Sequence, residues 1–356
     1  MYLYLSVILL TMIFALFSND KNKKVQVFVI MSLLTLIAGL RHYTIGSDTL
    51  AYLRNFNRMV YYGNEYFEIA RFEIGYVLLQ YAVIKIFANF NVFLFVCAAF
   101  INYSFGSMIC KYSKKPLLSV LLFILLRYFF GEMNILREYL AVAILLLSLK
   151  HVCNRKIVPF LIMILLASTF HTSALFAIPI YFLYDKEITF KNKIIISAVT
   201  GIIYLFLGNV LIYITSRIGI YNNYVELFIN SNKLGNLLEI LISICIYIFI
   251  KKLYKIYKEN IKETEIKFYN FLINISFIII PLQIISYKIS VFNRLVTYYS
   301  IFNILIISNF LYLIKDKKKR FLIQTIIIVL FFAYFGIITY YRPEWNKVFP
   351  YKFFWE

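Results

Sequence analysis

Long stretches without a charged side chain constrain this sequence more than any other feature. A soluble globular chain has roughly a quarter of its residues charged, whereas here 15% are charged and 62% are apolar. A helix that crosses a bilayer needs about 20 apolar residues, in a range of roughly 17 to 25, and most of the uncharged stretches reach that length. These stretches are residues 3–18, 25–40, 92–110, 194–216, 268–287, 295–314 and 321–341. The sequence therefore predicts an all-α polytopic integral membrane protein.

The net charge of +20 lies mainly in short segments between the apolar stretches. Loops rich in Lys and Arg between membrane spans face the cytoplasm, where they meet anionic membrane lipid. A nucleic-acid-binding protein would gather its basic residues on one folded face, so no nucleic-acid partner is expected. The four cysteines are far apart and lack metal-binding spacing, and neither a metal nor a cofactor is expected. The basic segments are residues 21–24, 111–115, 150–156, 186–193, 251–267 and 315–320.

The basic loops also allow the spans to be counted, because two loops on one side must be separated by an even number of spans. Residues 116–130 and 134–149 fit as one such pair. The short run at 74–87 breaks the parity, which favours a re-entrant or interfacial helix there. The sequence predicts about 11–13 transmembrane helices in a single transmembrane domain over residues 1–356. Its largest external loops are expected at about residues 41–73 and 217–235.

Residues 157–184 form an apolar segment too long for one span, because a continuous helix of that length would measure about 42 Å against a core of about 30 Å. A polar cluster around His171 lies at its centre, and Pro159 and Pro179 flank it. Irregular backbone at membrane depth is tolerated where it lines a cavity. We expect a broken or re-entrant segment here, with His171 facing a cavity near the outer surface.

The segment after the span at 25–40 carries the first candidate residues. Arg41 follows the span directly, Gly46 allows a turn, and Asp48 precedes an amphipathic helix expected to begin near Thr49 and to include Tyr52. Asp48 fits two roles equally well. It is either a helix cap among interfacial aromatic residues or a carboxylate that acts as a base or a sugar ligand at the membrane face.

Further ionisable residues stand at the external starts of apolar spans, where burial is costly and function is the default hypothesis. Arg137 and Glu138 open one such span, and Arg294 opens another with Tyr298 one helical turn later. A structural Arg137–Glu138 pair remains the alternative for the first. Arginine suits multidentate phosphate binding, and imidazole exchanges protons near neutral pH. Glycosyl transfer from a lipid pyrophosphate fits these residues, although composition alone does not separate it from transport.

Four motifs in order resemble the EpsG-type family of bacterial exopolysaccharide and O-antigen polymerases (Wzy-like proteins). The first joins residues 39–41 with residues 45–49 and Tyr52, and the second is Arg137 with Ala141. The third starts at His171 with residues 171–174 and continues to 179–181, and the fourth is Arg294 with Tyr298. Together they run over roughly residues 36–300.

The resemblance implies a membrane-embedded glycosyltransferase fold of the GT-C-like type in the bacterial plasma (inner) membrane. The substrate would be undecaprenyl-pyrophosphate-linked oligosaccharide repeat units, delivered to the outer leaflet by a flippase and polymerised alongside a chain-length regulator. No metal or cofactor is clearly required. A lipid-linked oligosaccharide flippase and a membrane O-acyltransferase are the competing functions, and the sequence shows no second broken segment of the kind paired in transporters.

The resemblance also implies roles for single residues. Arg137 and Arg294 would bind pyrophosphate and stabilise the leaving group, with Arg41, Tyr52 and Tyr298 as further substrate-binding residues. The general base would be His171 or Asp48. Glu138 stands where such families often have Gln, which leaves open either a partly neutralised Arg137 or an alternative base.

Overall fold

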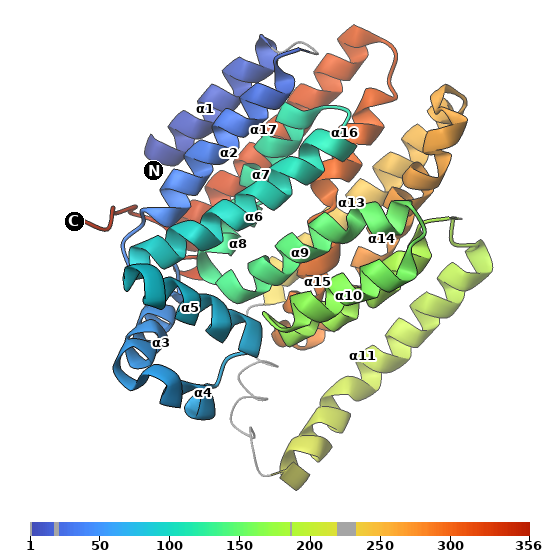
Figure 1. Ribbon diagram of the computed structural model, residues 1–356. Coiled ribbons are helices and arrows are strands. Elements are labelled where there is room, and N and C mark those ends of the chain that lie inside the picture. The colour runs from blue at the N-terminus through green and yellow to red at the C-terminus, as the bar shows by residue number, and fades with distance from the viewer. Residues whose placement is uncertain (1, 18–20, 186, 219–232) are drawn as a thin grey trace. The chain divides into compact units, whose positions relative to one another are not determined.

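The computed structural model describes residues 2–17, 21–185, 187–218 and 233–356 (Figure 1). Within those residues every regular element is a helix, apart from one isolated antiparallel bridge between Arg41 and Phe353. The predicted all-α polytopic class is therefore confirmed. The external loop expected at 217–235 falls mostly on residues 219–232, which lie outside the described residues.

The helices form two compact units. Unit 1 comprises Met1–Leu175 and Ile314–Glu356, and unit 2 comprises Phe176–Leu313. The 3-10 helix η2, Thr172–Leu183, contains the boundary. The other helices of unit 1 are α1 (Tyr2–Leu16), α2 (Lys23–Gly39), α3 (Thr49–Tyr62), η1 (Gly63–Glu65), α4 (Tyr66–Ile69), α5 (Ile74–Phe87), α6 (Phe90–Tyr112), α7 (Pro116–Leu125), α8 (Tyr128–Asn134), α9 (Leu136–Cys153), α10 (Ile157–Ser168), α17 (Lys317–Tyr341) and η5 (Pro343–Trp345). The prediction of a single transmembrane domain stays a prediction.

In unit 1, α6 packs against both α2 and α9, and α10 packs against α9. Every residue of α7 is buried, because this helix contacts α1, α2 and α17. The short helices α3, α4 and α5 gather at one end of the unit (Figure 1). The outer face of α17 instead exposes Phe321, Leu322, Val329 and Leu330. Such a continuous apolar surface is expected where a helix meets lipid.

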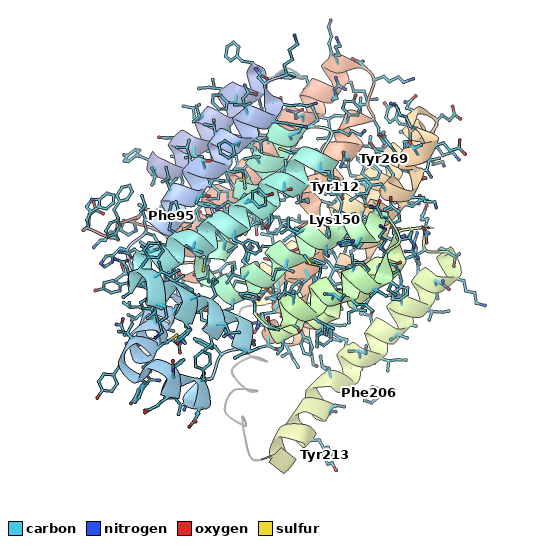
Figure 2. All side chains as sticks on the ribbon, in the orientation of Figure 1. Phe95, Tyr112, Lys150, Phe206, Tyr213 and Tyr269 are labelled. Atoms are coloured by element: carbon cyan, nitrogen blue, oxygen red, sulfur yellow. The ribbon has the colours of Figure 1, made fainter. Side chains whose placement is uncertain are left out.

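Unit 2 is built around α14 (Glu263–Lys288), which packs against α11 (Phe190–Ile218), α13 (Lys233–Tyr257) and α15 (Asn293–Ser300). The apolar α16 (Asn303–Tyr312) is buried along almost its whole length. Along α11 many large apolar side chains are exposed, and Phe206 and Tyr213 extend from the helix into the surroundings (Figure 2). The remaining elements are η3 (Lys258–Asn260) and η4 (Ser290–Phe292).

Six described helices are long and apolar enough to cross a membrane, or seven if a bent pair counts as one span. The six lie at Phe90–Tyr112, Phe190–Val210, Leu234–Asn260, Glu263–Lys288, Ser290–Tyr312 and Lys317–Tyr341. Four shorter apolar helices accompany them at Tyr2–Ala15, Ile74–Phe87, Ile157–Ser168 and Thr172–Leu183. The chain is thus a multi-pass membrane protein. Charge parity predicts 11–13 spans, which is more than the number of full-length apolar helices among the described residues. The difference arises because several apolar segments are short or broken.

Within the described residues, two breaks interrupt the apolar segments. The expected break near His171 is confirmed, since α10 ends at Ser168 and η2 begins at Thr172. A second break lies within residues 116–130, which the sequence predicts to be one span. There α7 and α8 meet at a 53° bend, and Arg127 between them adopts a positive φ of 69°. The Arg127 guanidinium donates a hydrogen bond to Asn346 and lies over the Trp345 ring, so this charged side chain leaves the apolar run.

Candidate active site

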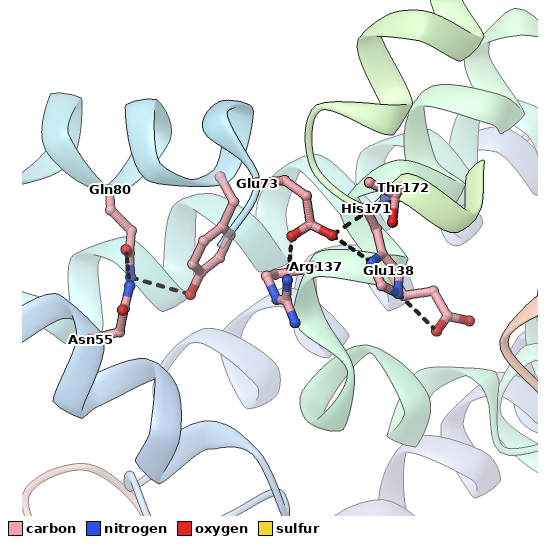
Figure 3. A network of polar contacts seen from close by, with 8 residues as sticks. Asn55, Glu73, Gln80, Arg137, Glu138, His171 and Thr172 are labelled. Carbon is pink, nitrogen blue, oxygen red and sulfur yellow. Dashed lines mark hydrogen bonds and ion pairs between the residues drawn. The ribbon is translucent and has the colours of Figure 1, made fainter. Parts of the chain in front are cut away.

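The carboxylate of Glu73 is the centre of a polar network in unit 1 (Figure 3). Glu73 occupies the residue before α5, in an extended conformation, and its side chain does not cap that helix. Oε2 accepts a hydrogen bond from Arg137 Nη1, and Oε1 pairs with His171 Nδ1 at 2.9 Å. The backbone N–H of Thr172 donates to the same Oε1 at 3.3 Å. Glu73 therefore joins the two residues that the sequence had singled out most strongly, Arg137 and His171.

Arg137 lies in the first turn of α9 and is held from two sides. Its guanidinium pairs with Glu73 and stands 4.2 Å from the centre of the Phe72 ring. The side chain is nevertheless 19% exposed, so the guanidinium is held in place but remains accessible to a ligand. A guanidinium has five N–H donors in a planar fork. Glu73 takes only part of that capacity, and the rest suits a phosphate-type anion.

His171 lies between two carboxylates. Nδ1 faces Glu73, and Nε2 lies 3.9 Å from Oε2 of Glu138. An ionised carboxylate only accepts hydrogen bonds, so Nδ1 carries the proton that is donated to Glu73, and Nε2 is the nitrogen available to take up another. Glu138 is 1% exposed and would face the positive charge that forms. Within the described parts of the chain, no group of His, Cys, Asp or Glu is arranged to hold a metal ion.

A close approach between α5 and the end of α10 holds the network together. The backbone N–H of Gly75 donates to the carbonyl of Thr169 at 2.8 Å. A Cβ at Gly75 would lie only 2.2 Å from Thr169 Oγ1, so a larger residue would separate the two segments. Glu73 precedes this contact by two residues and His171 follows it by two, and the contact therefore sets the distance between carboxylate and imidazole.

Two opposing effects set the pKa of Glu73. Burial by itself raises it, but the hydrogen bond from His171 and the charge of Arg137 prevail and lower the pKa from 4.5 to about 2. Glu73 is thus ionised throughout the physiological pH range. A carboxylate this acidic is a poor proton acceptor near neutral pH, so Glu73 orients and balances charge, and His171 is the better candidate for the base.

Glu73→Gln is expected to lower thermal stability at neutral pH. Because the folded pKa of about 2 lies below the usual 4.5, the ionised Glu73 stabilises the fold above about pH 4.5 by roughly 3 kcal/mol, and this contribution is lost as the pH falls toward 2. The measurement is the unfolding temperature of the purified protein in detergent from pH 8 to pH 3. The difference in unfolding temperature between wild type and variant, called the gap, should be constant down to pH 5 and should narrow below pH 4.5. The exposed Glu68→Gln on α4 is the matched control, and a gap that stayed constant to pH 3 would contradict the assignment.

Asp48 and Tyr52 approach the same network from α3. The helix begins at Thr49 as predicted, with Tyr52 buried on its inner face. Asp48 occupies the cap position, but the capping alternative is wrong in its detail, since its side chain makes no cap hydrogen bond and instead accepts one from the Ser47 hydroxyl at 3.2 Å. Burial raises the pKa of Tyr52 to about 12, with Asp48 raising and Arg137 lowering it. The Tyr52 hydroxyl is therefore neutral near pH 7, and the charges of Asp48 and Arg137 both act on it.

The loop before α3 is fixed to the end of α8, close in sequence to Arg137. The Ser47 backbone N–H donates to Asn134 Oδ1 at 2.6 Å. Gly46 has a φ of 94°, and a Cβ there would lie 2.3 Å from the Met133 carbonyl oxygen. Only glycine accommodates both the backbone angle and this approach. Asp48 is thus positioned by contacts on the segment that leads into α9.

Arg41 lies in a different environment from the one expected of a substrate-binding arginine. Its side chain is buried, donating to the carbonyl of Ala38 and, at 3.4 Å, to that of Met133. Its backbone pairs with Phe353 near the C-terminus. Arg41 thereby ties the end of α2 to α8 and to the C-terminal segment, and its contact with substrate stays a prediction.

Arg294 and Tyr298 belong to unit 2. Both lie in α15, where Arg294 is exposed and Tyr298 is fully buried. The two residues therefore do not share one accessible surface, although they are one helical turn apart. Their roles in substrate binding stay predictions.

The sequence-based interpretation missed Glu73 and Phe72. Glu73 stands immediately before the apolar run of α5, which is the same signal, an ionisable residue at the start of an apolar helix, that singled out Arg137 and Arg294. The parity of the basic loops favours a re-entrant or interfacial helix at 74–87, so the sequence does not mark Glu73 as the start of a span. The contact between Phe72 and Arg137 has no signal in the sequence, since it depends on how α5 and α9 meet.

Comparison with known proteins covers almost the whole chain. The model of the EpsG family matches residues 24–353 of 356. No match is found among curated proteins or among solved structures. The matched region contains Glu73, Arg137, Glu138 and His171 together with both ends of the motif series. The chain therefore belongs to the EpsG family.

Proposed function

We propose that this protein is a bacterial surface-polysaccharide polymerase that joins undecaprenyl-pyrophosphate-linked oligosaccharide repeat units at the outer leaflet of the plasma membrane. Membership of the EpsG family indicates a polysaccharide polymerase in general terms. The observation that carries the finer proposal is the network of Arg137, Glu73, His171 and Glu138. It combines a partly exposed cation, suited to a pyrophosphate, with an imidazole that has one nitrogen available for proton transfer.

In the proposed reaction, a hydroxyl at the non-reducing end of a new repeat unit attacks the anomeric carbon of the growing chain. The bond between that carbon and the pyrophosphate oxygen breaks, and undecaprenyl pyrophosphate leaves with the electron pair. His171 Nε2 takes the proton from the attacking hydroxyl. Arg137 stabilises the negative charge that develops on the leaving pyrophosphate.

The two carboxylates assist without touching the reacting atoms. Glu73 fixes the tautomer and orientation of His171 through Nδ1 and aligns Arg137 through its other oxygen. Glu138 offsets the imidazolium charge once Nε2 is protonated. Asp48 and Tyr52 lie toward the same site, with Asp48 as an alternative base, and Arg294, Arg41 and Tyr298 remain proposed substrate contacts. A flippase that supplies the units and a chain-length regulator are the proposed partners.

A complementation gel tests the proposal directly. In a host that lacks this gene but makes the lipid-linked unit, the surface glycan should run as a single repeat unit, and expression of the intact chain should restore a ladder of long polymer. The measurement is a length-resolved gel of surface glycan, with the protein amount in the membrane as the control.

Two other outcomes would overturn the proposal. Loss of all surface glycan, single units included, in the strain without the gene would assign a lipid-linked oligosaccharide flippase or an earlier step. An unchanged ladder with altered acetylation would assign an O-acyltransferase.

A further inference from the structure

A second polar site lies in unit 2, at the ends of α11 and α13, which the positive-inside rule predicts to face the cytoplasm. Glu187 pairs there with Lys193 at 3.0 Å and with Lys251 at 2.5 Å. These contacts join the start of α11 to the end of α13, two helices that both pack on α14. One carboxylate thus faces two ammonium groups, which leaves this corner of the unit positively charged.

Three further lysines extend the positive charge. Lys252, Lys255 and Lys258 are exposed, and with Lys251, Tyr254 and Glu187 they line a hollow of about 480 Å³. In the described part of the chain none of these three ammonium groups has a hydrogen-bond or ion-pair partner. Several unneutralised ammonium groups around one hollow attract a phosphate group.

An apolar groove continues from this hollow. It has a volume of about 900 Å³ and shares Glu187 and Lys251 with the hollow. The groove is lined by Phe190, Ile194 and Ser197 of α11, by Tyr247 of α13 and by Phe277 of α14. The Lys193 ammonium lies 5.8 Å from the Phe277 ring centre, at the transition between the charged and the apolar parts. The combined surface is charged at one end and apolar at the other.

We propose that this surface binds one anionic phospholipid of the cytoplasmic leaflet, with its phosphate on the lysine hollow and an acyl chain in the groove between α11 and α13. This site goes beyond the proposed polymerase activity, which rests on residues of unit 1. The charge of the lysines selects an anionic head group, and the apolar walls distinguish a lipid from a soluble phosphate. Bound lipid would hold α11 against α13 and α14. Without lipid, most of the α11 surface is exposed.

The test uses the full-length protein purified in a mild detergent. Short-tailed phosphatidylglycerol and phosphatidylcholine are titrated separately, and binding is followed by native mass spectrometry and by the unfolding temperature. Phosphatidylglycerol is expected to bind and to raise the unfolding temperature, whereas phosphatidylcholine does neither. In the variant Lys252→Gln/Lys255→Gln/Lys258→Gln the affinity for phosphatidylglycerol should fall about 10- to 100-fold, since each lysine near an anionic head group contributes up to about fivefold.

A matched control carries the same charge change elsewhere. Lys317→Gln/Lys318→Gln/Lys319→Gln removes three exposed lysines at the start of α17 and should leave phosphatidylglycerol affinity unchanged. Equal losses in the two triple variants would show non-specific attraction and overturn the site. An equal rise in unfolding temperature with inorganic phosphate alone would assign a soluble anion in place of a lipid.

The groove is tested separately. Ser197→Trp places a large ring in the groove and should weaken lipid binding, whereas Val199→Trp, on an exposed part of the same helix outside the groove, should not. Unchanged binding in the Ser197→Trp variant would contradict the acyl-chain position.

Discussion

His171→Ala is expected to reduce chain extension by about 10²- to 10⁴-fold, the usual contribution of general acid–base catalysis, while the protein still inserts into the membrane. The reason is the position of the ring, with Nδ1 held by Glu73 at 2.9 Å and Nε2 directed toward Glu138 at 3.9 Å. Without the imidazole, no other group in this network has a nitrogen that accepts a proton. Polymer formed from lipid-linked repeat units in isolated membranes, resolved by length, measures the effect.

A second substitution separates catalysis from folding. In His171→Asn the amide nitrogen can still donate to Glu73, but the side chain cannot take up a proton. Its unfolding temperature should match that of the wild type, and its polymerisation rate should be as low as that of His171→Ala. His151→Ala, in the last turn of α9 and at the opposite end of that helix from Arg137 and Glu138, should retain full activity. A normal polymer ladder from His171→Asn would exclude His171 as the base and turn attention to Asp48.

Arg137→Ala is expected to slow polymerisation by about 10²- to 10³-fold, comparable to the loss of one group that stabilises developing negative charge. Arg137→Lys should restore part of the rate, because it keeps the charge but loses the planar fork. The loss should appear mainly in kcat if the contact with pyrophosphate strengthens as the leaving group departs. The exposed Arg342→Ala, whose ion pair with Glu344 lies on the surface, is the control and should behave as wild type.

The double variant Glu73→Gln/Arg137→Ala distinguishes two roles for Arg137. The reference is the single variant Glu73→Gln, because Glu73 also orients His171. If the guanidinium only neutralised Glu73, adding Arg137→Ala should not slow polymerisation below the rate of Glu73→Gln. If it binds pyrophosphate, the double variant should be about 10²- to 10³-fold slower than Glu73→Gln, and equal rates in these two variants would reject the leaving-group role.

Local patterns in the sequence were sufficient for several elements. The amphipathic helix after Gly46 begins at Thr49 as predicted, because its apolar residues recur with helical spacing and pack on one side. The helix at Ile74–Phe87 has the predicted bounds, and the break at His171 follows from a segment too long for one span. The bend at Arg127 was missed, and the Arg127 side chain there bonds to Asn346, which is distant in the sequence.

The sequence by itself determined the class of the molecule, since the lack of charge over long stretches leaves lipid as the only suitable solvent. It also singled out Arg137, Glu138 and His171, because ionisable groups at apolar helix ends are costly unless they have a use. Only the tertiary structure identified Glu73 as their partner, across 64 positions to Arg137 and 98 to His171. Hydropathy and helical spacing report on neighbouring residues, whereas the meeting of a loop carboxylate with a buried imidazole depends on how α5, α9 and α10 pack.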